Sequence, residues 1–317
     1  MTDCLIIGGG IIGLTTARRL VMSGFKVTLV DKQKCGQESS WAGAGILTPL
    51  YPWKYSNFVN KLSFDSQKQY ANLCQELLKN TKIDPEYLNS GLLMMDEFES
   101  ETAKKWLKKF NINYQLTPKG ALFDICQVRN PKILQALKKD LELRGVEIFE
   151  NTQVSIKYLN NVATCQEIPA KNIIICAGSW SSEFGGTTYP VRGQVITLKD
   201  DSSIIKNIIL KDGKYIVPRQ DGVILIGSTM ENVGFDRTLS DAVKIELFEF
   251  ASAIFPHLKN CPITNHWCGF RPGNDFDPVI KESDKYPNLY FNYGHFRNGL
   301  NTAIASSDII LNLIKNK

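Results

Sequence analysis

The sequence is poor in the residues that hold metal ions or form cross-links. It contains only three histidines, and no two of them are spaced as a ligand pair. Its eight cysteines lie far apart, without a C-x-x-C pair or a cysteine–histidine cluster of zinc spacing. We therefore expect free thiols and no metal site.

Long apolar runs and a strong net charge are also absent. No apolar run approaches the roughly 18 residues of a membrane span, and residues 1–3 lead directly into a strand-like segment rather than a signal peptide. The 37 basic and 32 acidic residues leave a net charge of +5 and are mixed along the chain, which argues against a nucleic-acid surface. The expectation is a soluble, cytoplasmic protein without a membrane span or a nucleic-acid partner.

The start of the chain has the pattern of a strand–helix–strand unit. An apolar run at 3–7 is followed by a glycine-rich turn, a helix-like segment and a second apolar run at 25–30. The turn has the spacing G-x-G-x-x-G, with Gly8, Gly10 and Gly13, which suits the close approach of a pyrophosphate. Asp31 ends the second run, where an acid accepts hydrogen bonds from an unphosphorylated ribose. The pattern predicts dinucleotide binding, and an ordinary glycine-rich turn is the alternative.

The remaining 286 of the 317 residues predict an α/β protein with a β-rich insertion. Helices are expected at 63–79, 130–145, 239–255 and 299–314, and strands at 89–95, 146–149, 172–176, 191–198, 215–218, 222–226 and 289–292. Asn130 is the expected cap of the helix that has Pro131 at its first position. We expect a discontinuous dinucleotide-binding domain at 1–50, 120–186 and 265–317, with an antiparallel substrate or cap domain at 51–119 and 187–264.

Six motifs spread over the whole chain together resemble one known family. They are the glycine turn at 8–13, SSWAGAGIL at 39–47, AGSWS at 177–181, PVRGQ at 190–194, GFRP at 269–272 and GHFRNG at 294–299. In this order they resemble the FAD-dependent D-amino acid oxidase family, most closely its glycine oxidase branch. The resemblance implies a Rossmann-like FAD-binding domain interleaved with an antiparallel-β substrate domain.

The resemblance also implies an activity. Members oxidise an amine to an imine, which hydrolyses to a 2-oxo acid and ammonia, and pass the electrons to molecular oxygen to form hydrogen peroxide. For glycine the product is glyoxylate, in a branch that supplies thiazole synthesis for thiamine; sarcosine and small D-amino acids are further candidate substrates. The alternatives are a D-amino acid dehydrogenase that reduces a quinone or carrier, and a flavin-bearing binding module. Family precedent favours a homo-oligomer.

Oxidation of an amino acid requires that its carboxylate be held in place. Arginine suits this task because its planar fork donates two charge-assisted hydrogen bonds, and Arg271 of GFRP is the candidate anchor. The resemblance implies that Tyr215 contacts the same carboxylate, that Met230 narrows the pocket and that Arg297 lies on the substrate side of the flavin. The alternatives are structural ion pairs for the arginines and packing roles for Tyr215 and Met230. No general base is evident.

By the same resemblance the cofactor is FAD, and it is non-covalent because the surroundings of Cys268 differ from those in covalently linked sarcosine oxidase relatives. The expected contacts of the nucleotide part are Gly8, Gly10, Ile11, Ile12 and Gly13 at the pyrophosphate, Asp31 and Lys32 at the ribose, Ser39 and Ser40 at the phosphates, and the Val154 backbone at the adenine. Ala44, Gly45 and Ile46 are expected at the flavin, and Gly178 is a further expected contact. The turn expected along the flavin comprises His295, Phe296, Arg297, Asn298, Gly299, Leu300 and Asn301.

Two details of this assignment matter for function. The turn at 294–301 leads into the last predicted helix, whose dipole would stabilise negative charge on the reduced flavin, and His295 is expected to contribute through its backbone rather than as a base. The chain departs from the family in having Asp31 where Glu is common, and in lacking an Ala-Pro-Ala-x-Gly-like turn at 301–306. The sequence therefore leaves open the preferred amine and the reactivity with oxygen.

Overall fold

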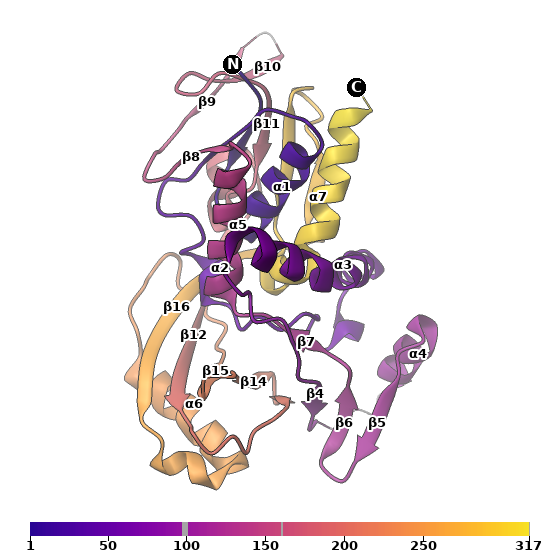
Figure 1. Cartoon of the computed structure of the whole chain (residues 1–317), viewed down its shortest axis with the longest axis vertical. Helices are drawn as coiled ribbons and strands as arrows, with labels where there is room; N and C mark the ends of the chain where they lie inside the picture. The colour runs from indigo at the N-terminus through magenta and orange to yellow at the C-terminus, as the bar shows by residue number, and fades with distance from the viewer. Residues whose placement is uncertain (97–100, 160, 317) are drawn as a thin grey trace.

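The computed structural model describes the chain except for residues 97–100, 160 and 317. Two β-sheets occupy opposite ends of an elongated molecule (Figure 1). The end that holds both termini is α/β, and the other end is built mainly from strands. No helix among the described residues is long and apolar enough to cross a membrane.

The first sheet has six strands in the order β17-β18-β11-β1-β2-β8. Their bounds are Val279–Glu282, Leu289–Tyr293, Ala170–Ile175, Thr2–Ile7, Val27–Val30 and Glu147–Phe149. All neighbours are parallel except β17 and β18, which pair antiparallel. The apolar run at the end of β1 fits a sheet with both faces covered: Cys4 and Ile6 join one core cluster, and Leu5 and Ile7 join another.

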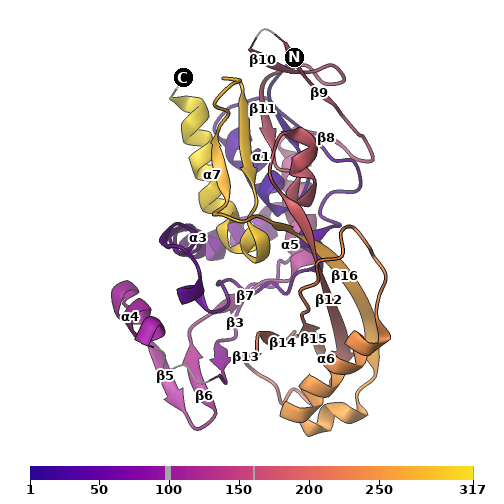
Figure 2. The ribbon, with the colours of Figure 1, turned by 180° about the vertical axis from the view of Figure 1, so that it is seen from behind.

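Four long helices pack at this end of the molecule. They are α1 (Ile11–Met22), α3 (Asn57–Thr81), α5 (Asn130–Leu143) and α7 (Gly299–Lys315). α7 lies against both α1 and α3, and α5 lies against the same two helices (Figure 2). The expected cap of α5 is wrong: α5 begins at Asn130 after Arg129, and the Asn130 amide donates instead to the carbonyl oxygen of Ser40 at 2.6 Å. Asn130 therefore ties α5 to the short helix α2 (Ser39–Ala42).

The second sheet has eight strands in the order β16-β12-β15-β14-β13-β4-β6-β5. Their bounds are Ile263–Gly273, Tyr189–Lys199, Val223–Gly227, Lys214–Pro218, Ile208–Lys211, Leu92–Met94, Gly120–Phe123 and Tyr114–Thr117. The expected antiparallel pairing holds except between β13 and β4, which are parallel. That pair joins two separate passes of the chain, so no hairpin turn fixes its direction. Helix α6 (Asp241–Ile254) packs through Leu247 against the apolar side chains of β12, β14 and β15.

Shorter elements complete the described chain. They are α2 (Ser39–Ala42), α4 (Glu101–Phe110), β3 (Leu88–Asn89), β7 (Cys126–Gln127), β9 (Ile156–Leu159), β10 (Val162–Cys165), and the 3-10 turns Pro52–Lys54, Gly178–Phe184, Pro256–Asn260 and Phe296–Asn298. β9 pairs with β10 and β3 pairs with β7. α4 projects with β5 and β6 away from the rest of the molecule in both views (Figure 1, Figure 2).

The sheets divide the chain differently from the expected domain boundaries at three places. β6 and β16 belong to the eight-stranded sheet, although residues 120–123 and 265–273 were expected in the dinucleotide domain. Helix α3 lies within the expected cap segment at 51–119, yet it packs against α7 and α5. β16 belongs to the second sheet because its backbone hydrogen bonds along its whole length are made with β12. The division into two functional domains stays a prediction.

Candidate functional site

A large cavity lies between the two sheets and is lined by both. One end is formed where the parallel strands β1, β2, β11 and β18 terminate, which is where ligands bind in open α/β sheets. The other end is formed by β12, β14 and β16 of the second sheet and by residues 38–50. The predicted site residues on its wall are Gly8, Gly10, Ile11, Ile12, Asp31, Lys32, Ser39, Ser40, Ala44, Gly45, Ile46, Val154, Gly178, Tyr215, Arg271, His295, Phe296, Arg297, Asn298, Gly299, Leu300 and Asn301.

The glycine turn between β1 and α1 is possible only without side chains. Gly8 has a φ of +108°, and a Cβ there would overlap the Cys176 carbonyl. A Cβ at Gly13 would overlap the carbonyl oxygen of Gly8. Gly13 does not line the cavity, so its position fits the packing of helix on strand rather than direct contact with a ligand.

The first turn of α1 lies on the cavity wall, where Gly10, Ile11 and Ile12 line it. No side chain caps this helix at Gly10, and its first turn contains no acidic residue. The Ile11 amide donates to Ser40 Oγ at 2.9 Å, which places the Ser40 hydroxyl beside the glycine turn. A helix start without an acidic residue, next to a hydroxyl, suits a phosphate, because the N–H groups of the first turn and the helix dipole both favour negative charge.

Asp31 lies at the end of β2 and holds the turn in shape. Its Oδ2 accepts from the Gly9 amide and its Oδ1 from the Gln33 amide, both at 2.7 Å. Burial raises the pKa of the Asp31 carboxyl above its ordinary value, and these two hydrogen bonds oppose that shift. Each carboxylate oxygen can still accept a further hydrogen bond from a ribose hydroxyl.

Lys32 follows Asp31 and is engaged by an aromatic ring and an acid. Its ammonium lies 4.1 Å from the centre of the Trp180 ring and 3.6 Å from the Glu183 carboxylate. All three side chains line the cavity near Val154. Phe235 stacks on the Trp180 ring at 4.7 Å, so this corner presents mainly the polar groups of Lys32 and Glu183 to the nucleotide end of a ligand.

Arg271 on β16 brings a buried positive charge to the opposite end of the cavity. Its Nη2 donates to Ser228 Oγ at 2.7 Å and its Nη1 to the Thr229 carbonyl at 2.9 Å. No carboxylate in the described part of the chain forms an ion pair with it. Burial lowers the pKa of the Arg271 guanidinium to about 10. A desolvated cation without an acidic partner is costly unless a ligand supplies the anion.

Tyr215 on β14 lines the same end and is buried. It pairs with Gly227 across the β14–β15 ladder, and a Cβ at Gly227 would lie 2.8 Å from the Tyr215 hydroxyl. A Cβ at Gly193 would likewise overlap the Arg271 guanidinium. Two glycines thus make room for the two side chains that were predicted to hold a substrate carboxylate.

Arg297 and Met230 lie next to each other at the edge of this region. The guanidinium Nη1 of Arg297 is 3.9 Å from the Met230 sulfur, and Arg297 lines the cavity. Met230 is 59% exposed and is not part of the described cavity wall. Its role in narrowing the pocket therefore stays a prediction.

His295 is buried and bonded through both ring nitrogens. Its Nδ1 lies 2.8 Å from Thr302 Oγ1, and its Nε2 lies 2.9 Å from Asn292 Oδ1. Burial lowers the pKa of the His295 imidazole to about 3, so the ring is neutral near pH 7. The sequence analysis anticipated only a backbone role and missed this link between β18 and α7.

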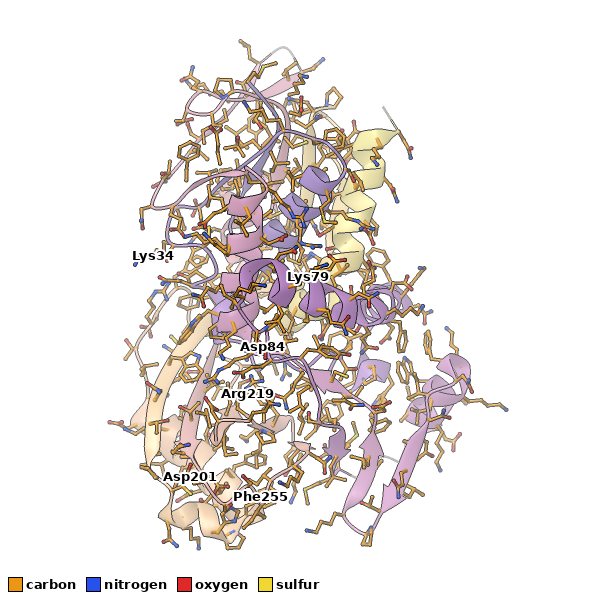
Figure 3. All side chains as sticks on the ribbon, viewed as in Figure 1. Lys34, Lys79, Asp84, Asp201, Arg219 and Phe255 are labelled. Carbon is orange, nitrogen blue, oxygen red and sulfur yellow. The ribbon has the colours of Figure 1, made fainter. Side chains whose placement is uncertain are left out.

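Arg219 is a second buried guanidinium that the sequence analysis missed. It lies between the two ends of the molecule (Figure 3) and donates to the carbonyl oxygens of Ala44 and Val128 at 2.8 and 2.9 Å, and to Gln127 Oε1 at 2.5 Å. Burial lowers its pKa to about 10. Arg219 therefore fastens the cavity-lining segment at Ala44 to the second sheet. The sequence offered one indication of this role, because Arg219 directly follows the strand that contains Tyr215.

The chain matches a family model over almost all of its length. The model is that of the DAO family, described as FAD dependent oxidoreductase, and it covers residues 3–313. The protein belongs to this family of FAD-dependent oxidoreductases. The family prediction and the α/β fold prediction are thereby confirmed, and so is FAD as the cofactor.

Full-length relatives are similar along the whole chain. A glycine oxidase of Pseudomonas aeruginosa is 35% identical, with coverage of 99% of this chain and 94% of the relative. A glycine oxidase of Pseudomonas putida is 33% identical, with coverage of 98% and 93%. A crystal structure of glycine oxidase from Bacillus cereus superposes with a TM-score of 0.90 at 27% identity, covering 100% of this chain and 95% of that one.

The residues on the cavity wall fit FAD. The glycine turn, the start of α1 and Asp31 fit the dinucleotide half, and the segments 42–46 and 294–301 line the path towards Arg271. Cys268 is not part of the described wall, and its sulfur lies 3.7 Å from the Arg237 carbonyl. That position agrees with the expectation of a non-covalent cofactor.

Proposed function

We propose that the protein oxidises glycine with FAD and molecular oxygen. The balanced reaction is glycine plus oxygen plus water giving glyoxylate, ammonia and hydrogen peroxide. The observation that carries the proposal is the buried Arg271, which lines the cavity without an acidic partner among the described residues. The similarity to glycine oxidases over the full length of the chain supports the same reaction.

In this proposal the protein's own residues bind and orient the substrate. Arg271 uses its remaining N–H groups for the carboxylate, and the Tyr215 hydroxyl supplies a further hydrogen bond. These contacts fix the direction of Cα relative to the cofactor. FAD, which the glycine turn at 8–13, Asp31 and the segments 42–46 and 294–301 would hold, would supply the acceptor for the hydride from Cα and the means of passing its electrons to oxygen.

The cavity provides no evident general base for this reaction. His295, the histidine on the described wall, is neutral near pH 7, but both of its ring nitrogens are already bonded. Three acids lie on the described wall: Asp31 and Glu183 line the nucleotide end, and Glu38 forms an ion pair with Arg237. The substrate must therefore enter or react as the neutral amine, which a poorly solvated pocket favours over the ammonium form.

A place in thiamine synthesis is part of the proposal. The chain is 28% identical to a bifunctional protein ThiO/ThiG of a Nostoc species over 98% of its own length and 52% of that protein. The glycine-derived imine would supply thiazole synthesis. Isotope-labelled glycine should pass its nitrogen into the thiazole when the enzyme is combined with a thiazole synthase, and an unlabelled thiazole would contradict this role.

The reaction is tested by product analysis. Purified holoenzyme with glycine in air should release glyoxylate, ammonia and hydrogen peroxide in equal amounts. Sarcosine and D-alanine serve as parallel substrates, since one methyl group changes binding by only about 1 to 3 kcal/mol. Product without peroxide, formed only when a quinone is added, would favour the dehydrogenase alternative. No product from any of the three amines would favour the binding module.

A further inference from the structure

Arg271 is held by a single turn, although it has no acidic partner of its own in the described structure. Its two hydrogen bonds end on Ser228 and Thr229, which directly follow β15. A guanidinium has five N–H groups, so these bonds leave others for the cavity. The orientation of the Arg271 guanidinium therefore depends on the contacts that fix the turn at 228–229.

Thr229 fixes that turn through its hydroxyl. The hydroxyl accepts a hydrogen bond from the backbone amide of Gln194 at 2.9 Å and donates one to Glu231 Oε1 at 2.5 Å. Gln194 lies on β12 and is fully buried. The turn that holds Arg271 is thus bonded both to the neighbouring strand and to an acid two residues further along the chain.

Glu231 accepts the hydrogen bonds that fix this turn in place. Its carboxylate accepts from the Gln194 side-chain amide at 3.0 and 3.2 Å and from Arg192 Nη2 at 2.6 Å. Its backbone forms a further bridge with Arg192, at 2.9 and 3.0 Å. The Arg192 side chain is 8% exposed and that of Glu231 is 21% exposed, so the ion pair is partly accessible to water. Such charge-assisted bonds are geometrically restrictive.

The placement of Glu231 has an electrostatic consequence. A carboxylate bonded directly to Arg271 would occupy the N–H groups that a substrate needs. Glu231 instead lies one side chain away, beyond Thr229, where its negative charge offsets the buried positive charge without blocking it.

We propose that Glu231 is a positioning residue for the substrate carboxylate, acting through Thr229 to aim the Arg271 guanidinium while leaving it free for the ligand. The inference rests on the proposed function, because it assumes that Arg271 binds a carboxylate. Glu231 itself does not line the cavity in the described structure.

The test uses FAD-loaded enzyme and follows flavin reduction by glycine without oxygen. Thr229→Val and Glu231→Gln should each raise the apparent Kd for glycine about tenfold. The limiting rate of flavin reduction should change by less than about threefold, because a wrongly oriented Arg271 weakens substrate binding more than it slows hydride transfer. Thr229→Ser keeps the hydroxyl and should restore the wild-type Kd. Asp236→Asn is the matched control, because Asp236 also bonds Arg192 at 2.8 Å but does not contact Thr229.

Two further readouts separate this proposal from the proposed function. Acetate, a carboxylate that cannot be oxidised, should perturb the visible spectrum of the flavin with an affinity reduced about tenfold in Thr229→Val, while FAD affinity stays unchanged. An unaltered glycine Kd in Thr229→Val would overturn the role of Glu231, even if Glu231→Gln fails to fold. If Arg271→Ala also leaves the glycine Kd unaltered, the carboxylate anchor in the proposed function fails as well.

Discussion

At the scale of single residues, Arg271 and Arg219 show two uses of a buried guanidinium. Burial lowers the pKa of each to about 10. Arg219 donates to three acceptors of the protein, including the Ala44 carbonyl. Among the described residues, the Arg271 guanidinium is bonded only by the turn at 228–229, and it lines the cavity. Arg219 is therefore a structural bridge, and Arg271 is the residue equipped to bind an anion.

Replacing Arg271 should selectively damage catalysis. Arg271→Ala removes the charged partner of the substrate carboxylate and should reduce kcat/KM for glycine by about 3 kcal/mol, roughly 100-fold. Arg271→Lys keeps a charge but loses the fork, so it should recover only part of that loss. Steady-state peroxide release measures both, and a kcat/KM within twofold of wild type for the alanine variant would remove Arg271 from the site.

Asp31 should control cofactor retention. Asp31→Asn weakens the acceptors of the Gly9 and Gln33 amides and of the expected ribose contact, so the Kd for FAD should rise by about tenfold or more. The matched control is Asp3→Asn, because Asp3 also accepts a backbone amide, from Lys26 at 2.9 Å, but lies at the start of β1. Fluorescence titration of apoprotein with FAD measures this, and equal affinities in both variants would contradict the assignment.

At the scale of elements, a buried polar network joins β18 to α1 and α7. His295 bonds Asn292 and Thr302, and the Asn292 amide donates to Thr16 Oγ1 at 3.2 Å and to Ser306 Oγ at 3.3 Å. Such a network specifies how elements meet, because each unsatisfied member would be costly. It holds the turn at 294–299 against the cavity.

His295 should make the fold sensitive to acid. Its folded pKa is about 3 against an ordinary value of 6.5, so the unfolded chain takes up a proton at this site between those values and the folded chain does not. The stability is present above about pH 6.5 and is lost as the pH falls towards 3. Urea unfolding at pH 7 and pH 5 should show a smaller loss in His295→Gln than in wild type; equal losses would contradict a neutral buried ring.

The elements that could be predicted from sequence are those with local signals. The unit β1–α1–β2 follows from glycine spacing and apolar periodicity, and most long helices begin and end within a few residues of prediction, apart from the start of α3 at Asn57. The parallel pairing of β13 with β4 and the full length of β16 depend on distant partners, which no local pattern encodes. Asn130 carried a cap signal, but its amide is used by the Ser40 carbonyl instead.

The candidate site likewise contains residues that could be predicted from sequence motifs and residues that could not. Motif matching placed Arg271, Tyr215 and the residues of the turn at 294–301 on one cavity wall. It did not reveal the Arg219 bridge or the Glu231 linkage, because these depend on side chains from separate strands meeting in space. It also gave no sign that the Met230 side chain would be mostly exposed.

At the scale of the whole molecule, the function depends on two sheets of different kinds. The parallel sheet ends at the dinucleotide half of the cavity, and the second sheet supplies Arg271 and Tyr215 from β16 and β14. The Arg219 bridge connects the two ends through its bonds to Gln127 and Ala44. The expected homo-oligomer remains a prediction, which light scattering would check as a mass that is a multiple of 35.6 kDa.

The most direct test of the central claim is the visible spectrum of the purified yellow protein without oxygen, before and after addition of glycine, followed by admission of air. The account predicts that glycine bleaches the flavin band and that air restores it promptly. A flavin that glycine does not bleach would contradict glycine as the substrate. A flavin that bleaches but does not recover in air would contradict the oxidase reaction.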